Sequence, residues 1–435
     1  AAICFADNAG DSSTGFSGTL ELDDCRQSRH DILKNVWDLF EALPYYRTRP
    51  RPDLVDRGYC LADPGRDYLV YLESPSPVRV AVEGGPYRVE WIDARRTDRR
   101  HFAELPVGQS VLTPPPGGDD WLLYLSRLPV APPRPSRHRF TVRQGKTWLD
   151  GREFRAVGLR VSNALLSDAA TDELLAHLSL FAAYGVNTIS VYLQGSRFGD
   201  VRGYRPDATL DPLYAARLAR IIEAADDRAM VVLVGCLYWG ETRAKFEHWT
   251  QTEANAAVAN TVRWLKERGY RNVFVDVDNE GMAQAEKGFD NRQLVLAGKA
   301  ADPECVIATN FRGLPPPEAD LGIHHSAKDP AKPYIESEGS AANVSGGYWG
   351  PYSKRERYYN YINIGVHTSE MQARQKADTA AHLERGWGYL LASTWLQCAP
   401  PHGPNHRPGG TGTPEDPGIR WWLEWVREQY GPYRP

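Results

Sequence analysis

Two acidic residues follow short apolar stretches in the second half of the chain. Residues 273–277 lead into Asp278, Asn279 and Glu280, and Tyr334 and Ile335 lead towards Glu338. The apolar, β-branched composition of both stretches is typical of buried strands, so each carboxylate is expected at a strand end. Two carboxylates that meet in one pocket can cleave a glycosidic bond: one protonates the leaving oxygen, and the other attacks or stabilises the anomeric carbon. This chemistry requires no cofactor.

A repeated strand–helix pattern supplies the elements that must position this pair. Amphipathic stretches at Thr171–Tyr184, Leu213–Asp226 and Ala254–Arg268 predict helices between apolar strands, with the first helix capped near Thr171. Eight such units predict an α/β fold with a (β/α)8 TIM barrel, although no clear helix joins the fifth strand to the sixth. The predicted strands are Phe154–Leu159, Thr188–Leu193, Met230–Gly235, Val273–Val277, Val306–Thr309, Leu321–His324, Pro333–Ser337 and Tyr389–Trp395.

Polar and aromatic residues at the C-terminal strand ends are the candidate site residues, because these ends share one pocket in a barrel of this kind. Strands four and seven place Glu280 and Glu338 on opposite sides of that pocket. Asp276 and Asp278 are expected to orient neighbouring side chains rather than to react. The strand-end candidates are Arg160 and Asn163 at strand one, Tyr192 and Gln194 at two, Tyr238 and Trp239 at three, Asn279 and Glu280 at four, His324 and His325 at six, Glu336 and Glu338 at seven, and Trp395 and Gln397 at eight.

Some of these residues have two possible roles. Trp239 and Trp349 can stack on a sugar ring or plug a small apolar space. His324 and His325 are a potential pair of metal ligands, but no third ligand stands at a recognisable spacing. We therefore predict no metal site and expect His325 to donate a hydrogen bond near Glu338.

The same residues resemble the clan of retaining glycoside hydrolases that have a (β/α)8 barrel. The resemblance covers roughly residues 145–435 and is carried by four segments: Thr147–Phe154, Asp278–Glu280, Lys332–Gly339 and Leu390–Trp395. It implies that Glu280 is the acid/base, Glu338 the nucleophile, Asn279 a hydrogen-bond partner of the sugar 2-hydroxyl and Trp395 a platform for the sugar.

The sequence departs from this clan at two positions. Gly339 follows Glu338 directly, which keeps Glu336 as a second candidate nucleophile. Gly281 stands where proline is common. Two other functions stay open: an inverting or apiosidase-like glycosidase, and a barrel that binds carbohydrate without catalysis.

A proline-rich stretch, residues 128–135, divides the chain into two parts that differ in their pattern of predicted strands and helices. We place the domain boundary there, with an N-terminal domain at 1–135 and the barrel at 136–435. Upstream, Asp31–Leu43 has helical periodicity, and alternating runs that follow predict a small antiparallel β-sandwich. Residues 61–72 and 87–96 resemble a β-sandwich module that accompanies glycosidase barrels and is named for collagen binding; we infer no collagen binding from that name.

Composition limits the partners. The net charge of −4 gives no electrostatic case for nucleic acid, so a neutral oligo- or polysaccharide is the expected substrate. The longest apolar run, Met230–Trp239, is about half the ~20 residues of a membrane span, so no membrane insertion is expected. Cys236, Cys305 and Cys398 are expected as buried thiols, whereas a Cys4–Cys25 bridge stays open. The expected location is secreted or periplasmic, with any signal peptide already removed.

Overall fold

A computed structural model gives the structure of the chain and describes residues 36–37, 39–40, 43, 45–83, 87–94, 100–105, 111–127, 134–195, 201–239, 246–339, 365–392, 396 and 408–435. The chain divides into two compact units, Ala1–Val130 and Ala131–Pro435, with the division inside the proline-rich stretch. Several residues named above lie outside the described part: Cys4, Cys25, Trp349, Trp395, Gln397 and Cys398.

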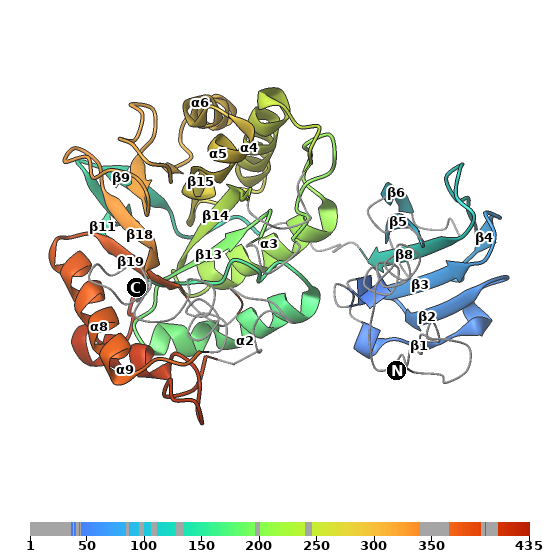
Figure 1. Ribbon diagram of the computed structural model, residues 1–435, viewed down its shortest axis with the longest axis horizontal. Coiled ribbons are helices and arrows are strands. Elements are labelled where there is room, and N and C mark those ends of the chain that lie inside the picture. Colours follow the sequence, from blue (N-terminus) through green and yellow to red (C-terminus); the bar gives the residue numbers. More distant parts are fainter. Residues whose placement is uncertain are drawn as a thin grey trace, which may run out of the picture. The chain divides into compact units, whose positions relative to one another are not determined.

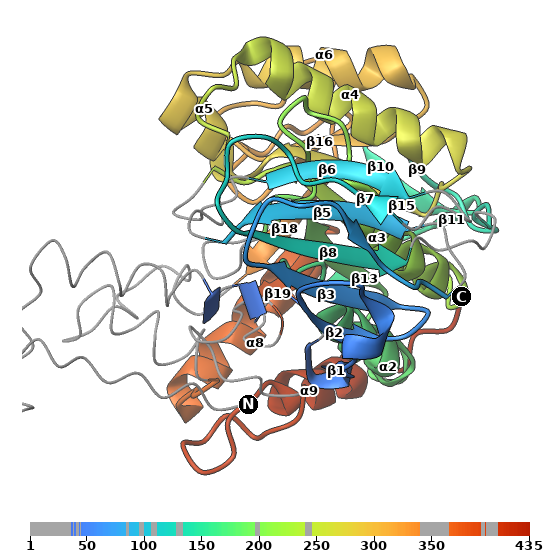
Figure 2. The same ribbon diagram turned by 90° about the vertical axis from the view of Figure 1, so that its right-hand side faces the viewer.

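The first unit is built on an antiparallel sheet of six strands in the order β1-β2-β3-β8-β5-β6, beside a two-stranded sheet of β4 and β7. Figure 2 shows the central strands β2, β3, β8 and β5 side by side. Side chains from both sheets, including Tyr68, Leu123 and Val78, form one buried cluster, which confirms the predicted sandwich-like fold. Positions 36, 37, 39 and 40 of the predicted N-terminal helix are helical. The elements are η1 (Tyr45–Arg47), β1 (Arg49–Pro50), η2 (Pro52–Leu54), β2 (Tyr59–Asp63), β3 (Asp67–Leu72), β4 (Val78–Arg79), β5 (Tyr87–Asp93), β6 (Arg100–Leu105), β7 (Val111–Leu112) and β8 (Trp121–Arg127).

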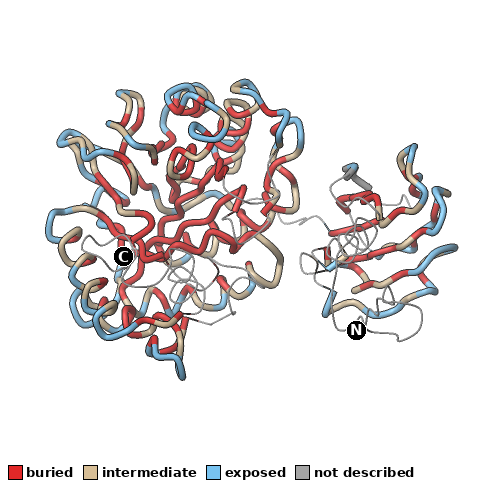
Figure 3. The backbone as a smooth tube through the Cα atoms, in the orientation of Figure 1, coloured by how far each residue is buried: buried red, intermediate tan, exposed pale blue. Residues whose placement is uncertain are grey.

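The second unit is a closed barrel of eight parallel strands, β12 to β19 in chain order. The fold prediction is therefore confirmed, and each predicted strand overlaps an observed one. In Figure 3 the barrel strands form a buried centre, while pale blue exposed segments lie on the surrounding helices and loops. The strands are β12 (Val157–Arg160), β13 (Thr188–Tyr192), β14 (Val231–Leu237), β15 (Val273–Asp278), β16 (Ile307–Thr309), β17 (Leu321–Ile323), β18 (Tyr334–Gly339) and β19 (Gly388–Ala392).

Helices surround the barrel, as Figure 1 shows for α2, α3, α4 and α8. The first begins earlier than predicted: the hydroxyl oxygen of Ser167 accepts a hydrogen bond from the Ala170 amide, whereas the Thr171 hydroxyl donates to the Ala164 carbonyl. As expected, no α-helix joins β16 to β17, a connection that is described throughout. None of the described helices has the length and apolar character needed to cross a membrane. They are α2 (Asp168–Ala183), α3 (Pro212–Asp226), α4 (Gln251–Glu267), α5 (Met282–Lys287), α6 (Asn291–Ala301), α8 (Ser369–Glu384) and α9 (Arg420–Tyr430).

A small antiparallel sheet packs at the N-terminal end of the barrel strands. It consists of β9 (Phe140–Arg143), β10 (Lys146–Leu149) and β11 (Arg152–Glu153). The Phe140 ring packs against Phe154 and against Phe274 near the start of β15, with ring centroids 5.7 and 5.3 Å apart. These apolar contacts fill this end of the barrel, so the polar residues gather at the opposite, C-terminal end.

Candidate active site

A fully buried arginine connects four strands at the C-terminal end of the barrel. Arg160, the last residue of β12, donates from Nη1 to the Tyr192 hydroxyl (3.1 Å) and from Nη2 to Oδ1 of Asn279 (2.9 Å). The same Nη2 lies 3.3 Å from Oε2 of Glu338. Since these partners come from β13, from the end of β15 and from β18, the guanidinium ties the predicted strand-end residues into one site.

A second layer of hydrogen bonds orients these side chains. Asp276 accepts from the Tyr192 hydroxyl (3.1 Å) and from Nδ2 of Asn310 (3.2 Å), which confirms its expected orienting role. Asn310 Nδ2 also lies 3.2 Å from Oδ1 of Asn279. Asn279 thus accepts from two donors, and its own Nδ2 is buried with no partner among the described residues. An amide donor fixed in this way is available to a hydroxyl group of a bound ligand.

Asn310 was missed by the sequence analysis. It follows Thr309 directly at the end of β16. This is the fifth barrel strand, at whose end the sequence suggested no candidate residue. Its Oδ1 also accepts from the backbone N–H of His325 (3.2 Å), so it positions the strand-six residue as well. The signal that could have found it is an asparagine at the end of an apolar strand.

A register shift at the end of β18 separates the two candidate nucleophiles. Ile335 belongs to the cluster inside the barrel, while the Tyr334 ring packs on His382 and Trp387 outside it. Alternation then directs Glu336 outward. The pairing of β18 with β19 is irregular between Glu336 and Gly339, and an extra residue of this kind re-aims the side chains that follow. Glu338 therefore reaches Arg160, and Glu336 does not.

Glu336 instead forms a buried pair with His324. Its Oε1 lies 2.6 Å from Nδ1 of His324 and accepts from the backbone N–H of Glu338 (3.0 Å), and its Oε2 accepts from the Tyr334 hydroxyl (3.1 Å). Burial alone would raise the pKa of Glu336, but His324 lowers it to about 2. Burial likewise opposes protonation of His324, but Glu336 raises the pKa of that ring to about 9. The pair is ionised and braces the strand end.

Glu280 stands on a strained turn directly after β15. It occupies η3 (Asn279–Gly281) with φ = 54°, and Gly281 follows with φ = 65°. Proline cannot adopt a positive φ, and a Cβ at position 281 would lie 2.9 Å from Cβ of Phe311. The backbone conformation and the contact with Phe311 therefore explain why glycine, and not the proline common in the resembled clan, stands at position 281. Backbone strain of this type is concentrated at functional sites.

The two carboxyl groups influence each other. Burial raises the pKa of Glu338 to about 7; Arg160 opposes this rise, while the charge and hydrogen bond of Glu280 add to it. Burial and the second carboxylate therefore outweigh the guanidinium.

The remaining candidates have different surroundings. Asn163 is buried just beyond β12, where its backbone N–H donates to the Leu396 carbonyl (2.8 Å), at the same end as Arg160. Trp239 is 4% exposed and packs on Trp249 and Phe289, at centroid distances of 6.1 and 5.7 Å. This enclosure favours the apolar plug of the two roles considered for Trp239, and its contact with a sugar stays a prediction.

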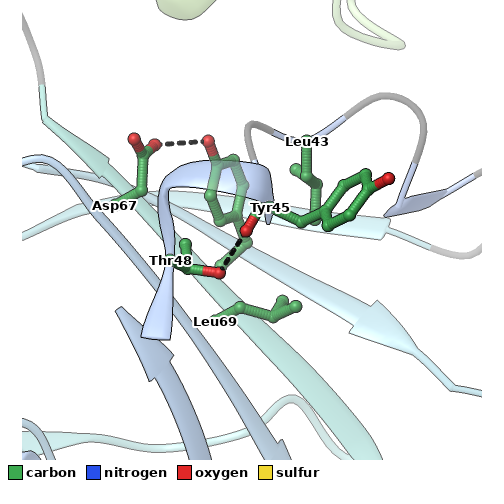
Figure 4. A pocket seen from close by; sticks show the side chains of 6 residues that line it. Leu43, Tyr45, Thr48, Asp67 and Leu69 are labelled. Atoms are coloured by element: carbon green, nitrogen blue, oxygen red, sulfur yellow. Dashed lines mark hydrogen bonds between the residues drawn. The ribbon is translucent and has the colours of Figure 1, made fainter. Parts of the chain in front are cut away.

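A small hollow in the first unit offers no alternative site. Figure 4 shows that Tyr45 and Thr48, at η1, lie beside it. The Tyr124 hydroxyl donates to Oδ1 of Asp67 there (2.7 Å). Its volume of ≈ 10 Å³ is room for about one water molecule, far too little for a sugar ring. The lining residues are Leu43, Tyr45, Thr48, Asp67, Leu69 and Tyr124.

Comparisons with known proteins give matches to solved structures alone. No family model matches the sequence, and no curated protein matches it. One similar solved structure is a glycoside hydrolase family 5 protein from Bacteroides vulgatus, with 14% identity and a TM-score of 0.41 over 58% of this chain and 61% of that one. A second is the β-glucanase SdGluc5_26A from Saccharophagus degradans in complex with cellotetraose, with 14% identity and a TM-score of 0.43 over 69% of this chain and 95% of that one. A third is an endo-1,4-β-mannanase from Rhizomucor miehei, with 10% identity and a TM-score of 0.40 over 58% of this chain and 89% of that one. The chain thus spans less than two thirds of the first of these proteins.

Proposed function

We propose that this chain is a retaining glycoside hydrolase in which Glu280 is the acid/base and Glu338 the nucleophile. The observation that carries the proposal is the meeting of these two carboxyl groups beside Arg160 and Asn279 at the C-terminal barrel end. The substrate class is an oligo- or polysaccharide. Asn163, Tyr192 and His325 are the further described residues that we assign to the binding site, and Trp395 is the proposed platform.

The proposed reaction has two steps. In the first, ionised Glu338 attacks the anomeric carbon while Glu280 gives its proton to the leaving glycosidic oxygen, which produces a glycosyl ester on Glu338. In the second, Glu280 takes a proton from water, the water oxygen attacks the anomeric carbon, and the Glu338 carboxylate leaves. The first step needs Glu280 protonated and Glu338 ionised.

The contact between the carboxyl groups supports retention. Inverting enzymes hold their carboxyl groups about 6.5–9.5 Å apart to admit a water, whereas retaining enzymes hold them about 5–5.5 Å apart. Glu280 lies close enough to Glu338 to hydrogen-bond with it and raise its pKa, which favours the shorter range. The unpartnered Nδ2 of Asn279 is suited to donate to a sugar hydroxyl.

The test separates the two glutamates by role. A leaving phenolate needs no proton, so Glu280→Ala should keep measurable activity on an activated aryl glycoside and gain more with azide. Glu338→Ala should lose activity on every substrate unless an external nucleophile replaces the carboxylate. NMR of the first-formed product should show the anomeric configuration of the substrate.

Two results would contradict the proposal. A product with inverted anomeric configuration would indicate a single displacement step in place of double displacement. Absence of turnover on a broad screen of aryl glycosides and polysaccharides, combined with measurable carbohydrate binding, would indicate a non-catalytic barrel.

A further inference from the structure

Three side chains at the barrel end form a cluster that the proposed reaction does not fully use. One ligand atom each from Glu280, His324 and His325 lie within 4.8 Å of one another, and all three residues are partly buried. The sequence offered two adjacent histidines without a third ligand, because the third comes from a different strand end. The fold supplies it: Glu280 follows β15, and the histidines follow β17.

Each histidine offers one ring nitrogen to an ion, and metal binding would displace the Nε2 proton that His324 carries in its ionised pair with Glu336. His324 uses Nδ1 for its 2.6 Å contact with Glu336, which leaves Nε2 for another partner. A carboxylate on the far nitrogen is the arrangement that commonly orients and strengthens a metal-ligating histidine. Nδ1 of His325 is buried, and no described group hydrogen-bonds to it.

We propose that Glu280, His324 and His325 bind one divalent transition-metal ion of the Zn²⁺ type. Two imidazoles and one carboxylate are a ligand set that such ions accept in proteins, with the fourth position open to water. Mg²⁺ and Ca²⁺ prefer oxygen ligands and should bind poorly. The inference rests on the proposed function in one respect: the metal occupies the proposed acid/base and so regulates the enzyme.

The geometry requires a modest contraction. The two imidazole rings stack at 4.3 Å between centroids with an 18° interplanar angle. A tetrahedral ion with bonds of 2.0–2.2 Å places its ligand atoms about 3.4 Å apart. The three ligand atoms lie within 4.8 Å of one another, so side-chain movements of the order of 1 Å bring them to this spacing. Glu280 is only partly buried, which leaves its side chain room to move.

Bound metal should inhibit hydrolysis reversibly. A Glu280 carboxylate that ligates an ion cannot carry the proton for the leaving oxygen or accept one from water. Excess chelator should therefore restore activity. Because activated aryl glycosides need the acid least, their hydrolysis should be inhibited less than that of substrates with poor leaving groups.

Direct binding is the primary experiment. The metal-free full chain is titrated with Zn²⁺ by calorimetry and with Co²⁺ by visible absorption, whose band intensity reports four-coordinate geometry. We expect one ion per chain, and at least tenfold weaker binding in His324→Ala and His325→Gln. The matched control is His138→Gln, because His138 pairs with Asp150 near β9 and lies outside the site.

Each outcome decides the proposal. No Zn²⁺ binding at 1:1 stoichiometry, or equal binding by wild type and His325→Gln, would overturn it; the milder His325→Gln variant keeps the test valid if His324→Ala fails to fold. Binding without inhibition would overturn the regulatory role. If the chain hydrolyses no glycoside, the binding titrations still decide the metal site, so failure of the proposed function is distinguishable.

Discussion

Arg160 controls the electrostatics of the site at the scale of single residues. It is completely buried and lies within 3.3 Å of Tyr192, Asn279 and Glu338. Its charge lowers the pKa of Glu338 against the combined effect of burial and Glu280. Arginine provides a fixed, planar set of donors here, which lysine cannot reproduce.

Replacement of Arg160 should shift the pH dependence of catalysis. Without the guanidinium, the pKa of Glu338 rises, so a larger fraction of the nucleophile is protonated at a given pH. Arg160→Gln should therefore move the acid limb of the kcat/KM profile to higher pH and lower its plateau by about 10²-fold or more. Arg160→Lys, which keeps the charge, should shift the limb less. An unchanged acid limb in Arg160→Gln would refute this assignment.

Glu336 and Glu338 should respond differently to the same substitution. Glu338→Gln should lower kcat/KM by about 10³-fold or more with a small change in stability, because the proposed nucleophile is removed. Glu336→Gln should lower the free energy of unfolding by about 3 kcal/mol, because it leaves His324 charged and buried. Denaturant unfolding and kinetics on both variants test this contrast. The reverse pattern would make Glu336 the nucleophile.

At the scale of elements, the end of β18 depends on a glycine. A Cβ at position 339 would lie 2.1 Å from the Tyr389 ring, so Gly339 permits the close approach of β18 and β19. The Tyr389 hydroxyl is held by Oδ2 of Asp378 in α8 (2.8 Å), which prevents the ring from moving aside. This close approach explains why a glycine stands at position 339, directly after Glu338.

Gly339→Ala should destabilise the barrel and displace Glu338. Overpacking of this kind costs about 1–3 kcal/mol, and displacement of Glu338, the proposed nucleophile, should lower activity as well. Gly409→Ala is the matched control, since a Cβ there meets nothing within 4 Å and should leave stability unchanged. Thermal melts of both variants decide the matter; equal melting temperatures would show that the strands can separate at no cost.

For the whole molecule, a buried histidine links α8 to the C-terminal helix. The His367 backbone N–H donates to the Gly412 carbonyl (2.6 Å), and its ring packs on Trp421 of α9 at 5.1 Å. Burial lowers the pKa of His367 to about 4, against a small opposing effect of the Gly365 carbonyl. The folded unit thus holds this ring neutral.

Stability should consequently fall in mild acid. The folded pKa of His367 lies below the unfolded value of about 6.5, so its contribution is present above pH 6.5 and is lost as pH falls through 4. Between pH 7 and 4 the wild type should lose about 3 kcal/mol more than His367→Gln, measured by denaturant unfolding. His248→Gln, at an exposed histidine, should follow the wild type. Parallel curves for wild type and His367→Gln would disprove the assignment.

The strands and helices of the barrel, and the residues at their ends, were predictable from the residue order. Strand and helix periodicity is a local property, so the eight strands, the helices between them and the strand-end positions of Asn279, Glu280 and Arg160 could be predicted from the order of residues. The first residue of a helix could not be predicted in the same way. Ser167 and Thr171 are both of types that cap helices, and only their contacts in the folded chain distinguish them.

Which of these side chains meet depends on the packing of the whole barrel. The irregular pairing of β18 with β19 turns Glu338 inward and leaves Glu336 with His324. Packing against Phe289 and Trp249 makes Trp239 an interior residue, and the closure of the barrel brings Glu280 to the two histidines. Each of these outcomes depends on contacts between residues far apart in the chain, and register, burial and charge at such contacts are set only when the barrel closes.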